Sequence, residues 1–461
     1  MVTSRPNGRA RRSLGSDERD EGCRAGQGSS EFGILDVLCS RTPTLGVARE
    51  GAMDRETLAT LNEDIDRLLA EFEGCFRSKC SREHLAVYVR GQLGPLQRKS
   101  VEPIALDAEV PPRSLQQFLG AHKWSEAHML RTVRRIVARD HLHPDGIGIV
   151  DDTSFAKKGN ETVGVQRQWC GTKGQVENCV QTVHITYATP ELSTIVDSDI
   201  FLPKSWAEDR PRRQAVGVPE AVTFRTKPQI AIDLLDRTVA DGVRPRWISA
   251  DEGYGRSSDF LVALQNRSFL YVVEVPCNTF GWTKRSKEHG GEARRADKLF
   301  PRGGPAWTTF NVKETTKGPQ VWHARATRFV LNSISQFAGE REHWLVIAEN
   351  ALTHEAKYFI SNAPDDTPIE TLLSVAFSRW NVERSFEDAK QEVGLDHFEV
   401  RTYPAVQRHL AISTVSLLFL ARSSRALKAE KKGELDDLSG AAVAERAHQP
   451  VRFSAVSASS H

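Results

Sequence analysis

Two short apolar runs of this chain end in aspartate, and a third acidic residue follows on an amphipathic helix. The first run ends at Asp151-Asp152, the second ends at Asp251, and the helix carries Glu383. Carboxylates at two rigid strand ends, joined by a third on a helix, suit two hard divalent cations. Such cations can clamp the attacking and leaving oxygens of a phosphoryl transfer. The pattern therefore predicts an α/β fold in which the acids meet at one edge of a sheet.

The composition is that of an ordinary globular chain and does not by itself indicate a partner. The 461 residues suffice for about two or three domains, and the formal net charge is only +2. Any affinity for nucleic acid must come from local basic clusters. The seven cysteines (positions 23, 39, 75, 80, 170, 179 and 277) include no CxxC pair, which argues against zinc and favours a reduced, cytoplasmic protein. The apolar run 411–421 is too short to span a bilayer, so no membrane partner is expected.

Composition and periodicity divide the chain into five parts. The first is rich in Gly, Arg and Ser, which predicts either disorder or a start codon placed too far upstream. The next part follows helical periodicity, and the rest alternates strands and helices before a charged and then small, polar tail. We expect a disordered or mis-assigned start at 1–52, a helical DNA-binding domain at 53–144, a catalytic core at 145–276 and 364–425, a β-rich insertion at 277–363, and a disordered tail at 426–461.

The helical part contains a stripe of arginines. A helix capped by Ser125 places Arg131, Arg135 and Arg139 on one side and apolar residues on the other. Ser114 is a candidate cap for the preceding helix, so the pair resembles a helix-turn-helix with a basic outer face. A solvated surface helix is the usual reading of an isolated arginine stripe, and only the site predicted downstream favours DNA here.

The core part is expected to contain a mixed sheet. Short connections suit an antiparallel arrangement of its first three strands, and a helical crossover makes the fourth parallel to the first. This is the order of an RNase H-like sheet. Strands are predicted at 146–151, 178–187, 194–201, 246–250 and 268–275, then at 321–331, 343–348 and 356–361; helices are predicted at about 227–240, from Ser257 or Ser258, at 368–394 and at 404–424.

Alternation along the first strand does not decide between Asp151 and Asp152, since each matches the parity of apolar residues before it. Taken alone, Asp-Asp-Thr would most simply be a turn. Asp251 could likewise belong to an ordinary strand-to-loop turn, and Glu252 is its competitor as a ligand. The apolar strand that runs directly into Asp251 favours the functional interpretation.

The spacing on the last acidic helix is more specific. Arg379, Glu383 and Lys390 fall within roughly 40° of arc at about 100° per residue, so one face carries a base, an acid and a base. A salt-bridged solvent face, with Glu387 as a further partner, is the alternative. Neighbouring aromatic residues, among them Phe386, indicate a helix packed into a core.

These motifs resemble the DDE transposases of bacterial insertion sequences, in the group with a Tyr-x2-Arg-x3-Glu-x6-Lys signature. Arg379-x3-Glu383-x6-Lys390 fits that spacing, whereas the signature's Tyr position is occupied by Ala376. Asp152-Thr153 fits the first strand end, and Asp251-Glu252-Gly253-Tyr254 fits the second. The segments 151–159, 163–169 and 383–395 also resemble a related insertion-sequence subgroup, and the resemblance covers about residues 80–425.

The resemblance implies an RNase H-like core and two Mg²⁺ ions, with Mn²⁺ as an alternative, held by Asp152, Asp251 and Glu383. A metal-activated water would cut transposon-end DNA, and the freed 3′-OH would attack target DNA. Arg379 and Lys390 would hold DNA phosphates. The Asp152 assignment follows this family pattern and Thr153. A homodimer in the DNA complex and a nucleoid-associated, cytoplasmic location are expected.

Other residues have weaker claims. Lys157 follows the first acids and could contact phosphate, although a solvated hairpin is about as common an explanation. Residues 166–169 could line a DNA path, and a tryptophan of the β-rich insertion could stack on a base, although such residues more often belong to a core. Competing functions are a DNA-binding protein of the same fold without turnover, a metal-dependent nuclease that does not transpose, and a two-carboxylate hydrolase acting on sugars.

Overall fold

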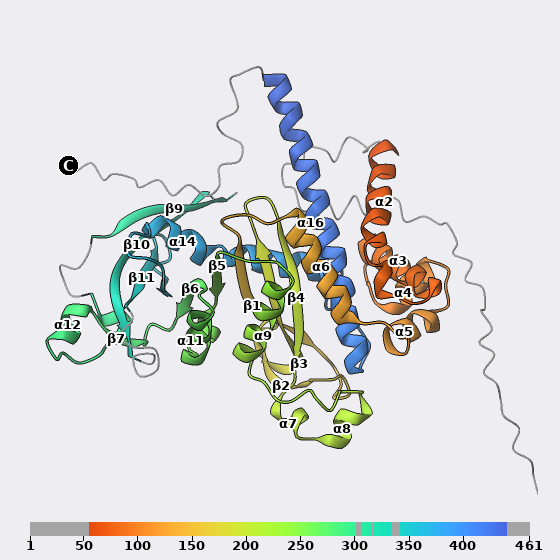
Figure 1. Ribbon diagram of the computed structural model, residues 1–461, viewed down its shortest axis with the longest axis horizontal. Helices are drawn as coiled ribbons and strands as arrows, with labels where there is room; N and C mark the ends of the chain where they lie inside the picture. The colour runs from red at the N-terminus through yellow and green to blue at the C-terminus, as the bar shows by residue number, and fades with distance from the viewer. Residues whose placement is uncertain (1–54, 301–305, 316–317, 333–341, 440–461) are drawn as a thin grey trace, which may run out of the picture.

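The computed structural model describes residues 55–300, 306–315, 318–332 and 342–439, so the predicted start segment 1–52 lies outside the described residues. The side chains of a few residues within these ranges, among them 380–384, are not described either. The described chain forms helices packed around one large mixed sheet (Figure 1).

The first described segment is helical, as its periodicity predicted. Its apolar stripe is buried, with Ile65 and Phe72 almost fully enclosed. The hydroxyl of Ser125 accepts from the amide of His128 and caps the arginine-bearing helix, as expected. The preceding helix begins at Pro112 instead of at a Ser114 cap, because proline suits the first helical turn. The helices are α2 (Arg55–Ala70), α3 (Lys79–Leu93), α4 (Val101–Asp107), α5 (Pro112–Gly120) and α6 (Glu126–Asp140).

The sheet begins with strands close to the predicted ones and one that was not predicted, β2. Its order starts β2-β3-β1-β5-β6, and β4 pairs with β3 on the side away from β1. β3 is antiparallel to β1 and β4, whereas β1, β5 and β6 are parallel to one another. The strands are β1 (Ile147–Ala156), β2 (Gln166–Cys170), β3 (Gln175–Ala188), β4 (Ser193–Phe201), β5 (Trp247–Ala250) and β6 (Leu270–Val275).

The crossover from β4 to β5 contains the predicted helix α9 (Lys227–Ala240). Thr226 and Gln229 form a reciprocal capping box at its start, which satisfies backbone donors of the first turn. Alternate residues of β1 contact opposite layers of the molecule: Asp152 reaches Lys227 at the start of α9, whereas Phe155 packs edge-on against Phe398. The other helices of this part are α7 (Lys204–Ala207), α8 (Arg210–Ala215), α10 (Glu252–Gly255) and α11 (Ser258–Asn266), the last capped by Ser257.

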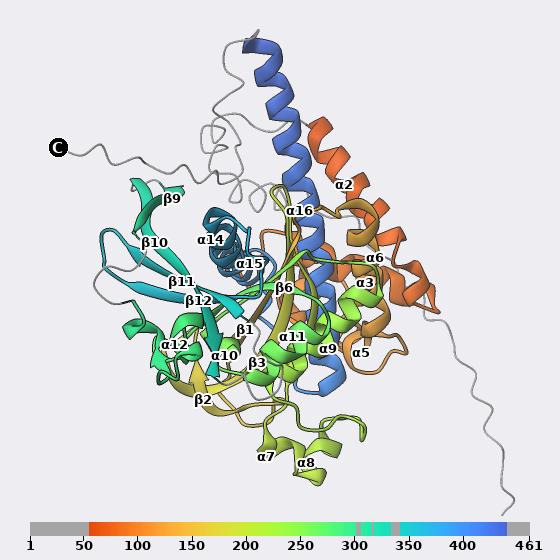
Figure 2. The ribbon, with the colours of Figure 1, turned by 60° about the vertical axis from the view of Figure 1, so that its left-hand side comes forward.

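The β-rich segment extends the same sheet instead of forming a separate one. β12 pairs antiparallel with β6, and β11, β10 and β7 continue outward from it. β10, β11 and β12 lie side by side in Figure 2. The three predicted strands of this segment correspond to β10, β11 and β12. The elements are β7 (Phe280–Trp282), α12 (Lys284–Glu288), β8 (Arg294–Arg295), β9 (Thr308–Thr315), β10 (Gly318–Leu331), β11 (Glu342–Asn350) and β12 (Ala356–Ser361).

The helix predicted at 368–394 is two helices, α14 (Ile369–Phe377) and α15 (Arg379–Gln391). The break lies at Ser378, whose hydroxyl donates to the carbonyl of Val375 at 2.7 Å. Such a bond back to the preceding turn bends helices. α14 buries its apolar side chains against the β-rich strands, and Phe386 of α15 packs against His184 of β3.

The last helix, α16 (Tyr403–Ser439), is longer than the predicted 404–424 and contains the start of the predicted tail; residues 440–461 lie outside the described residues. By length and composition it is the one described helix that could span a bilayer, but 78% of its apolar window is buried inside the protein. It runs beside α6 (Figure 1), and Tyr88 of α3 bonds His409 at 3.0 Å. These contacts are those of a core helix.

Candidate active site

Asp151 and Asp251 lie at the same edge of the sheet because their strands are parallel neighbours. Val150 of β1 is in register with Ala250 of β5, and each aspartate is the next residue. β5 ends there, and the carboxylate of Asp251 accepts from the amide of Tyr254 at 3.2 Å to cap α10. The prediction that the two acids converge is therefore correct for the backbone, but β1 continues to Ala156 instead of ending at its aspartates.

Asp151 and Asp152 point to opposite faces of the sheet. Asp151 pairs with His184 across the ladder, on the face covered by Phe386 of α15, and the guanidinium of Arg379 lies 3.5 Å from its carboxylate. Asp152 faces α9: its carboxylate is 2.7 Å from Nζ of Lys227 and accepts from the Tyr254 hydroxyl at 3.5 Å. Of the two, Asp151 shares a face with α15.

The carboxylates of this edge repel one another. Burial raises the pKa of Asp151 to about 7; Arg379 opposes this rise, and the charges of Asp251 and Asp152 add to it. The pKa of Asp251 is also raised, first by burial, with Arg379 opposing and Asp152 adding. These buried, mutually repelling carboxylates favour a bound cation, because its positive charge would offset both the cost of burying them and the repulsion between them.

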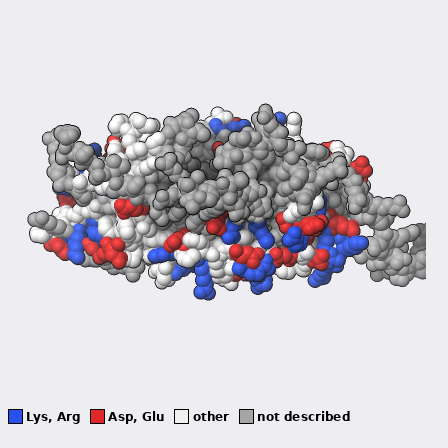
Figure 3. Space-filling view, turned by 90° about the horizontal axis from the view of Figure 1, so that it is seen from above, with Lys and Arg blue, Asp and Glu red and all other residues white. Residues whose placement is uncertain are grey.

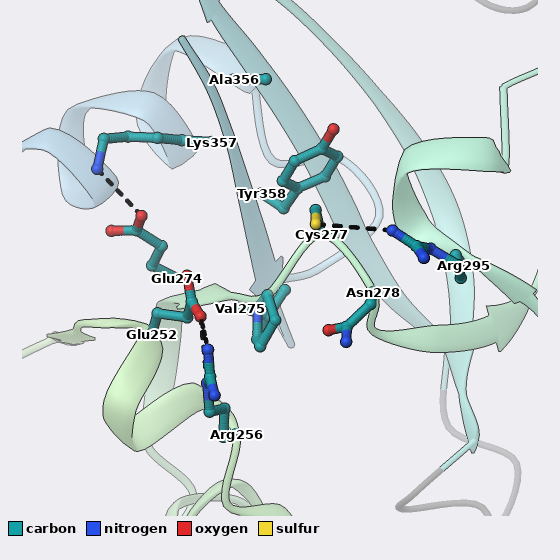
Figure 4. A pocket seen from close by; sticks show the side chains of 11 residues that line it. Glu252, Arg256, Glu274, Val275, Cys277, Asn278, Arg295, Ala356, Lys357 and Tyr358 are labelled. Carbon is teal, nitrogen blue, oxygen red and sulfur yellow. Dashed lines mark hydrogen bonds and ion pairs between the residues drawn. The ribbon is translucent and has the colours of Figure 1, made fainter.

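A fourth acid, Glu274 of β6, completes the edge and was missed from the sequence. Figure 4 shows its carboxylate directed at Lys357, at 3.0 Å. Its other oxygen is 3.9 Å from Arg379, so Arg379 lies among Asp151, Asp251 and Glu274. The sequence did contain a signal for Glu274, because it is an acid within an apolar strand. A strand parallel to β5 and next to it must bring such an acid to the same sheet edge.

Beside Glu274 lies a pocket of about 320 Å³ (Figure 4). Its wall includes Tyr358, the thiol of Cys277 and the guanidinium of Arg295, which bonds that thiol at 3.9 Å. Glu252, the competitor of Asp251, also borders the pocket and pairs with Arg256. Glu252 therefore has a partner of its own outside the acid cluster.

Lys157 and Lys390 are both partly buried, and only Lys390 lies near the acids. The Lys157 amine donates to the carbonyl of Phe398 at 2.7 Å and sits over its ring, and burial lowers its pKa to about 8. Burial likewise lowers the pKa of Lys390, while Asp151 is among the carboxylates that counteract this. Both remain predictions as DNA contacts.

The predicted arginine stripe is exposed on α6 and partly paired. Arg139 binds Glu71 and Asp140, each at 2.7 Å, and Arg131 lies 3.7 Å from Asp241. Arg135 is exposed. On the face seen in Figure 3, basic and acidic side chains are interspersed over the atoms that are not grey, in keeping with the small net charge. A role of this helix in DNA binding stays a prediction.

The residues present suit a hard cation by their chemistry. Glu383 lies on α15, but its side chain is outside the described residues. Among the side chains that are described, no three Asp, Glu, His or Cys residues already form a metal site. Asp151 and Asp251 nevertheless offer the carboxylate oxygens that Mg²⁺ prefers, and the raised pKa of both is the observation that fits a cation beside them.

Comparison with known proteins agrees with this chemistry. Residues 71–332 match the family model described as "DDE superfamily endonuclease". A protein of Microchaete diplosiphon named "Probable transposase for insertion sequence element IS701" is 25% identical over 327 residues, which are 69% of this chain and 76% of that protein. The crystal structure of the NurA nuclease from Sulfolobus solfataricus covers 68% of this chain and 91% of its own at 11% identity, but its TM-score of 0.24 is too low to support any argument.

The resemblance to DDE insertion-sequence transposases drawn from the motifs is thus confirmed by both sequence matches. The family match spans more than half of the residues and includes both Asp151 and Asp251 of the acid edge. The chain belongs to the DDE superfamily of endonucleases.

Proposed function

We propose that this protein is an insertion-sequence transposase that cuts transposon-end DNA and joins the freed 3′ end to target DNA. The observation that carries the proposal is the meeting of Asp151 and Asp251 at one sheet edge, on the β1 face covered by the helix that bears Glu383. The similarity to a probable insertion-sequence transposase supports the choice of DNA as substrate.

An RNase H-like core is part of the proposal. The order β4-β3-β1-β5-β6, with β1, β5 and β6 parallel and β3 and β4 antiparallel to their neighbours, supports it. On this interpretation β7 to β12 are an insertion that prolongs the sheet from β6. The N-terminal helices would form a DNA-binding domain, and two copies of the chain would act together on the DNA.

Members of this superfamily use divalent metal ions, and we propose two Mg²⁺ ions, replaceable by Mn²⁺. Asp251, Glu383 and one aspartate of the first pair would hold them. The family pattern favours Asp152, but the sheet face and the contact with Arg379 favour Asp151, which we propose as the first ligand. When bound, the ions would activate the attacking water and neutralise charge at the scissile phosphate.

The protein's own residues orient the substrate around this edge. Arg379 lies within reach of Asp151, Asp251 and Glu274 and is suited to hold a phosphate drawn to the same place. Lys390, about three turns farther along the same face of α15, is suited to the same role. Lys227 and the Tyr254 hydroxyl fix the Asp152 carboxylate on the opposite face, so Asp152 would support the strand end.

The test uses a plasmid that carries the gene with its flanking DNA, incubated with the full chain and Mg²⁺, Mn²⁺ or EDTA. The expected result is metal-dependent cleavage at the element's ends and joining to target DNA. Asp151→Asn, Asp251→Asn and Glu383→Gln should each reduce cleavage about a thousandfold or more while DNA binding persists. Asp145→Asn, an exposed aspartate ahead of β1, is the matched control and should cut normally.

The Asp152→Asn variant tests which residue of the Asp151-Asp152 pair is the first metal ligand. Full loss of cleavage in Asp152→Asn and retention in Asp151→Asn would restore the assignment made from the motif. Binding without any cleavage in either metal would indicate the inactive DNA-binding protein, and cleavage without joining would indicate a nuclease that does not transpose. Cleavage that persists in EDTA would contradict the metal mechanism.

A further inference from the structure

The hairpin formed by β2 and β3 displays an unusual outer face. Trp169 and Val176 are in register across the hairpin, and their side chains are 60% and 48% exposed. Arg167, on the same face of β2, is exposed beside them. Neighbouring exposed apolar side chains of this size are suited to a contact surface.

The opposite face of the hairpin is held in place by hydrogen bonds. The Gln168 amide donates to the carbonyl of Cys179 at 3.0 Å, and the Gln181 amide donates to the carbonyl of Trp169, also at 3.0 Å. Both Cys170 and Cys179 are buried on this side. The backbone of Trp169 is therefore fixed while its indole faces solvent, which makes the ring a preorganised platform.

The hairpin turn contacts β1 close to the acid edge. The amide of Gly171 donates to the Ser154 hydroxyl at 3.4 Å, and the Thr172 hydroxyl donates to the Ser154 carbonyl at 3.3 Å. Ser154 is on β1, two residues after Asp152. Cys170 also lies close enough to Lys390 to influence the pKa of its amine. The hairpin thus borders the place where the carboxylates meet.

The charges around this face suit a polyanion. Lys158 follows β1 and Lys173 lies in the hairpin turn, and both are exposed, as is Arg167. The single acid of the hairpin strands, Glu177, is in register with Gln168 on the opposite face and accepts from the amide of Asn178. An exposed indole flanked by cations is the combination that binds unpaired bases, since the ring stacks on any base and the cations follow the phosphates.

We propose that Arg167, Trp169 and Val176 form a surface that binds a single-stranded DNA segment at the cleavage edge, with Trp169 stacked on an unpaired base. This inference rests on the proposed function and adds the substrate form: a DNA end opened next to the scissile phosphate. Arg167 holds a backbone phosphate of the same strand. Val176 supports the indole from the neighbouring strand.

The experiment measures binding of the full chain to two labelled DNA probes of mixed sequence by fluorescence anisotropy in EDTA. One probe is a blunt duplex, and the other has the same duplex with a single-stranded 3′ extension. Trp169→Ala should weaken binding of the extended probe about tenfold, the fold-change given by about 1.4 kcal/mol of stacking, and should leave the blunt duplex nearly unchanged. Trp169→Phe should retain most of the affinity, because an aromatic ring remains.

Two further variants sharpen the test. Arg167→Gln should reduce the slope of log affinity against log salt concentration by about one, as expected for a lost phosphate contact. Phe280→Ala is the matched control, because Phe280 of β7 is another exposed aromatic residue, outside the hairpin. A melting curve for each variant shows that it folds.

The outcomes separate this inference from the proposed function. Equal binding of the extended probe by wild type and Trp169→Ala, with DNA binding intact, overturns the inference alone. Loss of self-association in Trp169→Ala without loss of DNA affinity overturns it in favour of a surface between copies of the chain. A wild-type protein that binds neither probe nor its own flanking DNA overturns both proposals.

Discussion

Two of the places where the described residues bury aspartate in the central sheet handle the charge in opposite ways. Asp197 of β4 is fully enclosed and lies 2.9 Å from the guanidinium of Arg134 and 3.0 Å from that of Arg237. Arg134 also binds Asp241 at 2.7 Å, so acids and bases alternate. At the acid edge, by contrast, Asp151 and Asp251 follow paired residues of two parallel strands and share Arg379 as their main opposing charge.

The contrast between Asp197 and Asp151 distinguishes an ion network that only stabilises the fold from a site that can bind a charged ligand. The pKa of Asp197 is raised by burial, but its charged neighbours, Arg134 and Arg237, all favour its ionised form. The pKa of Asp151 is raised by burial and by other carboxylates as well. A site left short of positive charge is suited to receive a cation or phosphate-bound metal, whereas a balanced network is suited only to hold elements together.

The largest effect on stability is expected from Asp197→Asn. Removing this carboxylate leaves Arg134 buried with half of its charge pairing gone, which should lower the free energy of unfolding by about 3–5 kcal/mol. The measurement is urea denaturation, with Asp145→Asn as the exposed control. A variant as stable as wild type would show that the buried network does not stabilise the fold.

A nearly equal effect, of opposite sign, is expected at Asp151 and should depend on pH. The folded pKa is about 7 and the ordinary value is 3.8, so on raising the pH the unfolded chain loses this proton first. Wild type should therefore lose stability relative to Asp151→Asn between about pH 4 and 7, by up to roughly 4 kcal/mol. The difference should be constant outside this window.

This pH effect is measured as the difference between the two urea curves in EDTA, because groups distant from Asp151 titrate equally in both proteins. A difference that does not change with pH would mean that Asp151 is ionised in the fold throughout, and the contrast with Asp197 would vanish.

A middle-sized effect is expected from metal. If the acid edge accepts a divalent ion, Mg²⁺ at a hundred times its dissociation constant should stabilise wild type by about 2.7 kcal/mol. Asp251→Asn should abolish this gain, and Asp145→Asn should keep it. A gain of the same size in Asp251→Asn would place the ion elsewhere.

A smaller effect is expected at Glu274, which holds Arg379 beside the acids. Glu274→Gln should reduce cleavage about tenfold, equivalent to about 1.4 kcal/mol, while leaving the melting temperature nearly unchanged. Glu355→Gln is the matched control, because Glu355 lies 3.8 Å from the same Lys357 but is largely exposed. Since Glu274 acts through Arg379, Arg379→Gln combined with Glu274→Gln should cut no worse than Arg379→Gln alone.

The smallest effect is expected for the surface pairs of α6. Arg139 binds Glu71 and Asp140, but its side chain is 57% exposed, so Arg139→Gln should change stability by less than about 1 kcal/mol. DNA affinity of the full chain is measured in parallel. If the helix binds DNA as predicted, the affinity should fall and become less sensitive to salt.

The helices and strands that position the site were predicted well from the sequence. The directions of the side chains within the site were predicted less well. Apolar runs ending in acids fixed β1 and β5, and the capping residues placed α9 and α11. Alternation along β1 could not choose between Asp151 and Asp152, because both faces of this strand are buried and carry apolar residues. Only the packing of α15 on one face distinguishes them.

Other features depend on contacts that are distant in the sequence. Arg379 was predicted from the helix face alone, and its position among Asp151, Asp251 and Glu274 follows from the antiparallel pairing of β12 with β6, which periodicity does not encode. The break at Ser378 was missed because serine is compatible with either a continuous or a bent helix. The predictions for Lys157 and Arg139 likewise took these side chains to be available for DNA. In the fold, each has a partner of its own.

The position of α16 has a consequence for how the protein is made. Residues 61–137 of the N-terminal helices share one hydrophobic core with residues 405–420 of α16. Buried polar bonds join the same ends of the chain, among them the Gln92 amide to the Ser413 hydroxyl at 2.8 Å. During synthesis the core shared by the N-terminal helices therefore stays incomplete until α16 has left the ribosome. A chaperone that shields nascent chains should raise the yield of this protein, and a message cut short before codon 403 should yield only aggregate.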